Sequence, residues 1–373
     1  MAVTINGTNG LTYNDGTQQS SAPGGKNLII NGNMQIAQRG TSATGITSSN
    51  YYTLDRWRTV NDTTGTWTQT QDTDVPTGQG FSNSLKMDCT VADASLSAND
   101  GLQIHTRLEG QNLQHLKKGT SNAESITVSF WVKSNKTGTY IYELYDQDNA
   151  RQVSKSYTID TADTWEKKTI TIDGDTTGAF DNDNANSLSS TFWLSAGSNK
   201  TSGTLNTSWA ASVTANRVVG QVNLADSTAN YINITGVQLE VGDTATDFEN
   251  LQYGQQLALC QRYYEPTNGR EALLARILQT NTRVRSQWHW KTPKRTAPTL
   301  SIDYVGAGLI TCYYGDSGSR NVSHSQTTLN TATINGCFID ITISETMIAN
   351  IGATLQVRGD LGGETRLIAD SEL

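Results

Sequence analysis

Aromatic and hydrogen-bonding side chains alternate with aliphatic ones along several strand-like segments of the chain. In ITVSFWVK, residues 126–133, every second residue is aliphatic or Phe, which leaves Trp131 on the opposite face of a strand. The same alternation at 103–109, 191–195 and 231–241 assigns further residues to a polar face: His105, Arg107, Trp193, Gln238 and Glu240. A sugar needs such a surface, because a ring stacks on its C–H face while polar groups bind its hydroxyls. We predict that these residues form a carbohydrate-binding face.

The two tryptophans have a second explanation that the sequence leaves open. Loops or helices of the same domain, or a neighbouring subunit, would bury Trp131 and Trp193 equally well. Subunit interfaces are also enriched in aromatic residues. On that interpretation the face is structural and binds no sugar.

An aspartate-rich loop, DGDTTGAFDND, offers oxygen ligands of the kind that Ca²⁺ binds. Its acidic residues are Asp173, Asp175, Asp181 and Asp183. Their spacing does not match an EF-hand, which requires a bidentate Glu at the end of its loop. A solvated turn is the favoured interpretation, with Ca²⁺ kept as an alternative, and no other cofactor is expected.

Motifs for catalysis are missing from the sequence. It contains no nucleophile elbow, HExxH motif, P-loop or GxGxxG fingerprint. The 35 Asp and Glu residues could include a glycosidase pair, because the separation of such carboxylates is spatial rather than sequential. We therefore predict a protein that is not an enzyme and keep polysaccharide cleavage as an alternative.

The composition narrows the class of partner. The 373 residues carry a net charge of −8, and only 17% are charged, against about 25% in an average globular protein. Binding to a phosphate backbone requires clustered Lys and Arg, so no nucleic-acid partner is expected. We interpret the basic stretch at 283–295 as a solvated strand and turn. The chain has no secretory leader, no run of about 18 apolar residues and no CxxC pair, so we expect no membrane span and free thiols.

Turn residues and hydrophobic periodicity divide the chain into three parts. Residues 1–26 are too few to bury a core, so we expect them to dock on a partner or on copies of themselves. Residues 27–249 show regularly spaced strands and one short helix at 110–118. Residues 250–373 begin with a helix, one face of which carries Tyr253, Leu257, Cys260 and Tyr264, and then become β-rich again. The predicted fold is all-β: a jelly-roll β-sandwich, a short helix and a second, smaller β-sandwich.

Several blocks of the chain resemble phage tail-fibre and related virion proteins, especially those of marine and cyanobacterial phages. The blocks are NLIINGNMQIAQRGTS, YYTLDRWR, RLEGQNLQHLKKGT, ITVSFWVKSNKTGTYIYELYD, YTIDTADTWEKKTITI and ITGVQLEVGDTATDFE, with the helix LQYGQQLALCQRYYE and the closing LIADSEL behind them. GLTYNDGTQQSS is similar to the short N-terminal segment of phage fibres. The blocks follow one another in the order of that family.

The resemblance implies a carbohydrate-binding-module-like jelly roll at 27–249 and a β-sandwich tip. It also implies a homotrimer on the virion, attached to other tail or capsid proteins through residues 1–26, that adheres to a host surface glycan. A protein that only decorates the capsid or tail, without binding sugar, is the alternative, and a depolymerase is a further one. The family supplies no catalytic residues and no fixed sugar-contacting motif, so the predicted site residues remain those of the polar face.

Overall fold

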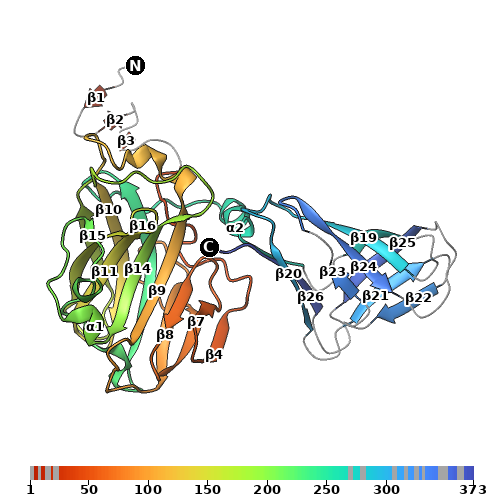
Figure 1. Ribbon diagram of the computed structural model, residues 1–373, viewed down its shortest axis with the longest axis horizontal. Helices are drawn as coiled ribbons and strands as arrows, with labels where there is room; N and C mark the ends of the chain where they lie inside the picture. The colour runs from red at the N-terminus through yellow and green to blue at the C-terminus, as the bar shows by residue number, and fades with distance from the viewer. Residues whose placement is uncertain are drawn as a thin grey trace. The chain divides into compact units, whose positions relative to one another are not determined.

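The chain forms two compact units, Met1–Gln252 and Tyr253–Leu373 (Figure 1). This computed structural model describes residues 4–6, 10–12, 18–19, 25–267, 272–277, 283–304, 309–314, 318–322, 327–329, 332–342, 352–358 and 365–373. Near the N-terminus, three short strands form an antiparallel sheet: β1 (Thr4–Asn6), β2 (Gly10–Thr12) and β3 (Gln18–Gln19). The role predicted for residues 1–26 stays a prediction, since most of this segment lies outside the described residues.

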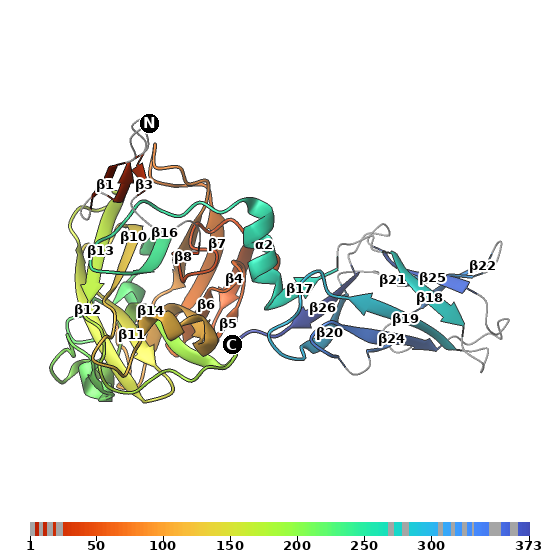
Figure 2. The same ribbon diagram turned by 90° about the horizontal axis from the view of Figure 1, so that it is seen from above.

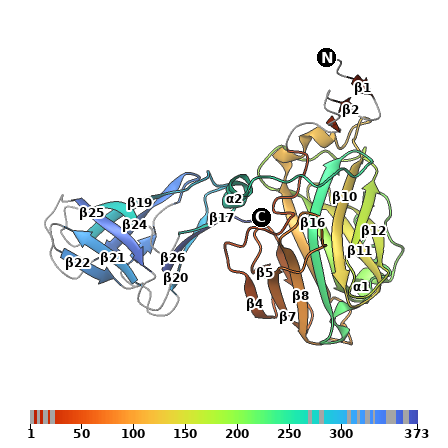
Figure 3. The same ribbon diagram turned by 180° about the vertical axis from the view of Figure 1, so that it is seen from behind.

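The body of the first unit is a sandwich of two antiparallel sheets, which lie face to face in Figure 2. Sheet I has six strands in the order β13 (Glu166–Ile172), β10 (Ile126–Ser134), β16 (Tyr231–Val241), β8 (Ser84–Val91), β7 (Thr66–Asp72) and β4 (Ser42–Ile46). Figure 3 shows strands β10, β16, β8, β7 and β4 of this sheet side by side. Neighbours in the sheet are often distant in sequence, as expected for a jelly roll.

Sheet II has seven strands and forms the other layer of the sandwich. Their order is β15 (Ala210–Ala211), β12 (Arg151–Ile159), β11 (Gly138–Asp146), β14 (Asn186–Ala196), β9 (Gly101–Glu109), β6 (Arg58–Asn61) and β5 (Asn50–Tyr51). The helix α1 (Ser198–Thr201) lies between β14 and β15, and the 3₁₀ turns η3 (Thr214–Asn216) and η4 (Leu224–Asp226) lie between β15 and β16 of sheet I.

The core between the sheets follows from the period-two alternation of the strands. Phe130 of sheet I packs edge-on against Phe192 and Tyr157 of sheet II, with ring centroids 4.9 and 5.0 Å apart. The aliphatic residues that alternate with Trp131 in β10 are all buried in the same cluster. Edge-to-face aromatic pairs add about 0.5–1.5 kcal/mol each beyond the burial of their area. The predicted all-β sandwich is confirmed, and its inward residues are those that alternation identifies.

The helix predicted at 110–118 is wrong in type. The segment forms two 3₁₀ turns, η1 (Gly110–Asn112) and η2 (Gln114–Leu116), which place Leu113 and Leu116 in the core. Lys117 then adopts left-handed backbone angles, with φ of 52°. Gly119 also has a positive φ, and a Cβ there would lie 2.6 Å from the backbone nitrogen of Ala179. The close approach of the loop around 178–179 requires this glycine.

The second unit is the smaller sandwich that was predicted. A three-stranded sheet has the order β17 (Tyr264–Pro266), β26 (Thr365–Asp370), β20 (Thr299–Tyr304). A seven-stranded sheet has the order β22 (Gly318–Val322), β21 (Leu309–Tyr314), β25 (Gly352–Arg358), β18 (Ala272–Ile277), β19 (Arg283–His289), β24 (Gly336–Thr342) and β23 (Thr327–Leu329). Residues of both sheets share one core, in which Trp288 and Trp290 pack edge-on with centroids 4.6 Å apart.

The helix of the second unit, α2 (Tyr253–Gln261), buries only part of the predicted face. Its buried residues are Gln256, Cys260 and Gln261, while Tyr253 is 60% exposed. The helix ends before Tyr264, which belongs to β17. In the described part of the chain, Cys89, Cys260 and Cys337 are buried and form no disulfide. No helix among the described residues is long and apolar enough to cross a membrane.

Candidate functional site

The structure divides the predicted polar face between two sheets. Trp131, Gln238 and Glu240 lie on β10 and β16 of sheet I, whereas His105, Arg107 and Trp193 lie on β9 and β14 of sheet II. Each set points away from the shared core, so the two sets lie on opposite sides of the sandwich. The prediction of one shared face is therefore corrected. Alternation distinguishes inward from outward residues, but it carries no information about which sheet a strand joins.

On sheet I, the polar residues of the set serve to hold a neighbouring segment of the chain. Glu240 accepts hydrogen bonds from the backbone nitrogen and the hydroxyl of Thr246, at 2.9 and 2.6 Å. Gln238 accepts one from the backbone nitrogen of Glu249 and donates to Glu240. Gln238 is fully buried and Glu240 is 3% exposed. These side chains have structural partners, and Trp131 beside them is half-buried.

On sheet II, Trp193 is fully buried and cannot stack on a ligand from solution. Its Nε1 donates to Glu143 Oε2 at 2.9 Å, and the ring packs with Ile141 and Val218 in a small cluster outside the main core. The guanidinium of Arg217 lies over the ring, 5.2 Å from its centroid. Trp193 is therefore buried within its own domain, as the alternative interpretation of the sequence allowed. Its ring packs beneath the guanidinium of Arg217.

Strand register brings polar side chains into line across the outer face of sheet II. Directly paired positions on the consecutive strands β5, β6, β9, β14, β11 and β12 are Tyr51, Arg58, His105, Thr191, Glu143 and Ser154, which we call the polar row. A second row, two residues further along each strand, contains Arg107, Ser189, Tyr145 and Gln152. Paired residues of an antiparallel sheet share a face, so both rows lie on the same surface.

Half-exposed tyrosines stand toward the two ends of this surface. Tyr51 lies on β5 and Tyr145 on β11, four strand spacings or about 19 Å apart. Arg217 is held by Glu143 through two hydrogen bonds of 2.7 Å and lies over the Tyr145 ring, 5.1 Å from its centroid. Burial lowers the pKa of Arg217, but the Glu143 carboxylate outweighs this effect, so the pKa is raised overall. This fixed ion pair sets the orientation of the Tyr145 ring.

Three buried polar atoms on this surface lack hydrogen-bond partners among the described residues, and the first of them lies on a strand between the two tyrosines. They are Nε2 of His105, Oγ of Ser154 and Nε2 of Gln152, on three side chains that are at most 6% exposed. Burial, followed by the charges of Arg107, Arg58 and Arg56, lowers the pKa of His105 well below 6.5, so its imidazole is neutral at neutral pH. An unsatisfied buried polar group costs about 1–3 kcal/mol, and such groups are retained where a ligand or water completes them.

The aspartates of the predicted calcium loop do not converge on a cation site. Asp173, Asp181 and Asp183 are exposed, and the described residues contain no group of three or more potential metal ligands. Only Asp175 is buried, and it is bound to Arg151 through two hydrogen bonds of 2.7 and 2.9 Å. Burial raises the pKa of Asp175, but the hydrogen bonds from Arg151 and Lys118 lower it overall.

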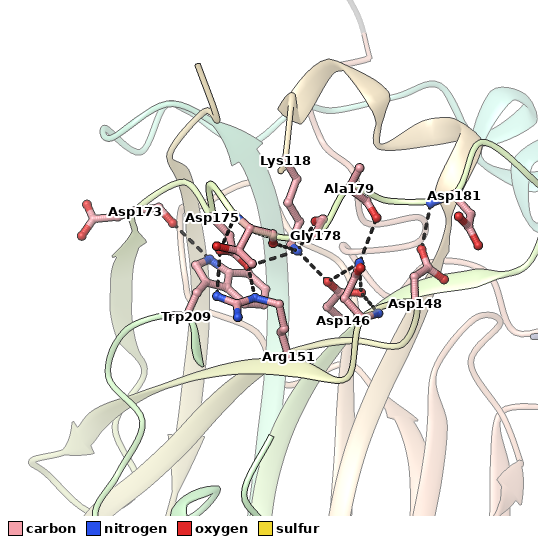
Figure 4. A network of polar contacts seen from close by, with 12 residues as sticks. Lys118, Asp146, Asp148, Arg151, Asp173, Asp175, Gly178, Ala179, Asp181 and Trp209 are labelled. Carbon is pink, nitrogen blue, oxygen red and sulfur yellow. Dashed lines mark hydrogen bonds and ion pairs between the residues drawn. The ribbon is translucent and has the colours of Figure 1, made fainter. Parts of the chain in front are cut away.

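The ammonium group of Lys118 lies where the oxygens of this region gather (Figure 4). It contacts carboxylate oxygens of Asp146 and Asp175 at 2.6 and 3.0 Å, and the backbone oxygens of Thr177 and Gly178 at 3.0 and 2.6 Å. Carboxylates and carbonyls are the ligands that Ca²⁺ would use. The chain therefore supplies its own cation at this position.

A hollow of about 400 Å³ lies beside Lys118 and is a second candidate ligand site. Its lining includes Leu113, Gln114, Lys117 and Phe180. Gln114 already donates to the backbone oxygens of Gly110 and Asp181, and Lys117 is paired with Glu124. Because Gln114 and Lys117 already have partners within the chain, we regard this hollow as a weaker candidate ligand site than the outer face of sheet II.

Sequence reasoning identified part of the candidate face and missed the rest. The strand YIYELYD, 140–146, alternates Tyr140, Tyr142 and Leu144 with Glu143 and Tyr145, so its outward residues could have been recognised. Arg217 comes from a loop without periodicity and gave no signal. Arg58 lies in the block YYTLDRWR and was not among the predicted site residues, and only the register opposite His105 places it here.

No protein family and no curated protein matches this chain. Among solved structures it is similar to the enzymatically active domain of tailspike protein 4 from Bacteriophage CBA120, at 14% identity and a TM-score of 0.30, covering 58% of this chain and 21% of that one. It is also similar to the family 11 carbohydrate-binding module of Clostridium thermocellum in complex with a β-1,3-1,4-mixed-linked tetrasaccharide, at 10% identity and a TM-score of 0.29, covering 55% and 98%. A third similar structure is TmCBM61 in complex with β-1,4-galactotriose, at 10% identity and a TM-score of 0.30, covering 58% and 99%. At such TM-scores these likenesses add nothing to the assignment of the site, which rests on the geometry above.

Proposed function

We propose that this protein binds glycans on the outer face of sheet II. The observation that carries the proposal is that two half-exposed tyrosine rings, Tyr51 and Tyr145, share the outer face of sheet II with the half-buried Arg58. Tyr51 and Tyr145 offer stacking surfaces, and the arginines offer donors for hydroxyl groups.

The arrangement is suited to binding rather than to bond cleavage. Glu143 is the only carboxylate of the polar row, and it is fully buried and held by Arg217 and Trp193. A glycosidase would need a second carboxylate facing the first across the scissile bond. The separation of the two tyrosines by about 19 Å favours an extended saccharide over a single sugar.

Substitution of the ring that is free of the core tests this proposal. The protein is screened on a glycan array of extended oligosaccharides, and the oligosaccharides that bind are then titrated. Tyr145→Ala is expected to weaken their binding at least about tenfold. Tyr253→Ala is the matched control, since Tyr253 is exposed on the other unit. Loss of binding in Trp131→Ala with no change in Tyr145→Ala would instead place the site on sheet I.

We further propose, on the resemblance of its sequence blocks, that the protein is a homotrimeric phage virion appendage attached through residues 1–26. Three weak sites per trimer and many trimers per particle would convert weak contacts into firm adhesion. Light scattering of the purified chain should give the mass of three chains, and antibodies should label the virion. A monomer at micromolar concentration would contradict the trimer, and unlabelled particles would contradict the location.

A further inference from the structure

The outer face of sheet II carries positive charge at one end, although the whole chain has a net charge of −8. Arg58 lies directly opposite His105 in the polar row, and Arg107 lies two residues further along β9. Arg56 joins them, because its guanidinium donates to the backbone oxygen of Arg107 at 2.5 Å. Three arginines therefore surround one imidazole.

The histidine among these arginines adds no charge that would compete for an anion. Burial, and then Arg107, Arg58 and Arg56 in that order, lower its pKa, so it is neutral at neutral pH. A neutral imidazole offers one donor and one acceptor, and the Nε2 of His105 has no partner in the described part of the chain. Because this Nε2 is buried, the charge of the arginines, rather than a hydrogen bond from His105, would attract the ligand.

Arg58 is the arginine of this group that is best placed to bind a ligand. It is half-buried at the start of β6, and none of the described carboxylates forms an ion pair with it. By contrast, Arg217 at the other end of the face is neutralised by Glu143. A guanidinium matches a carboxylate through two parallel hydrogen bonds, and such charge-assisted bonds are about twice as strong as neutral ones.

We propose that this face selects acidic glycans, polysaccharides that carry carboxylate groups along the chain, with Arg58 as the anchor for a carboxylate. The inference rests on the proposed function, because it assigns a ligand class to the same face. Tyr145 would stack on a sugar ring further along the saccharide. The carboxylate would lie near the Tyr51 end, where Arg58, Arg107 and His105 meet.

A matched pair of ligands tests the inference. The full-length protein is titrated with a polygalacturonate oligomer and with the same oligomer after chemical reduction of its carboxyl groups. The acidic oligomer is expected to bind at least about tenfold more tightly, and the difference should shrink as salt is raised. Arg58→Gln should remove most of this preference, because it should weaken binding of the acidic oligomer much more than binding of the neutral one.

Two controls keep the outcomes distinct. Lys167→Gln removes the same charge from an exposed position on sheet I and should preserve the preference, and both variants should melt as the wild type does. Equal affinity for both oligomers, with dependence on Tyr145, would overturn the acidic ligand and leave glycan binding standing. No binding of either oligomer, or of any glycan on the array, would overturn both, and tighter binding of single-stranded DNA would overturn the ligand class.

Discussion

The Lys118 side chain is predicted to be among the most sensitive positions of the first unit. The side chain is 4% exposed, and its ammonium group holds Asp146, which is fully buried, together with Asp175. In Lys118→Met, Asp175 keeps Arg151, whereas Asp146 keeps only the backbone and side-chain nitrogens of Asn149. A buried charge without its ion partner costs about 3–5 kcal/mol. For a unit of this size the loss corresponds to a fall in Tm of about 6–20 °C.

Calorimetry compares Lys118→Met with the matched variant Lys117→Met. The comparison separates loss of the buried ion pair from the effect of replacing any lysine by methionine. Lys117 pairs with Glu124 on the surface, where both side chains are well exposed, so its replacement should cost at most about 1 kcal/mol. The double variant Lys118→Met/Asp146→Asn removes both partners and should recover much of the lost stability, since no unpaired charge remains buried. Equal, small effects of Lys117→Met and Lys118→Met would refute the reasoning, as would a double variant less stable than Lys118→Met.

The remaining predictions concern metal, pH and the second unit. Because Lys118 supplies the cation between the oxygens of its loop, neither Ca²⁺ nor EDTA should change the Tm of the wild type, and a rise with Ca²⁺ would contradict this. The folded-state pKa of His105 is lowered, so the unfolded chain binds a proton near pH 6.5 that the folded chain does not. Stability should fall as pH drops below about 6.5, by up to about 1.4 kcal/mol per unit, and urea titrations of His105→Gln should show a smaller fall. In the second unit, Lys294 and Glu265 form a buried pair at 2.5 Å, so Lys294→Met should lower the Tm of that unit selectively; an unchanged transition would show that the pair contributes nothing.

Alternation and turn residues were enough to predict the all-β class and much of the core. Phe130 and Phe192 were assigned inward positions from their neighbours alone, and both are fully buried. The type of the turns at 110–118 was not predictable in this way, because spacing at three positions is shared by α-helical and 3₁₀ turns. Local patterns report which way a side chain points along its own strand.

Which residues come together in the site is decided by contacts between parts of the chain that are distant in sequence. Trp131 and Trp193 show the same outward signature in sequence, yet they lie on different sheets, and only one of them is buried beneath a loop. Arg58 meets His105, and Lys118 meets Asp146 and Asp175, through pairings that span tens of residues. Strand order and register are set by hydrogen bonds and packing between segments, so no window along the chain contains the information that brings these groups together.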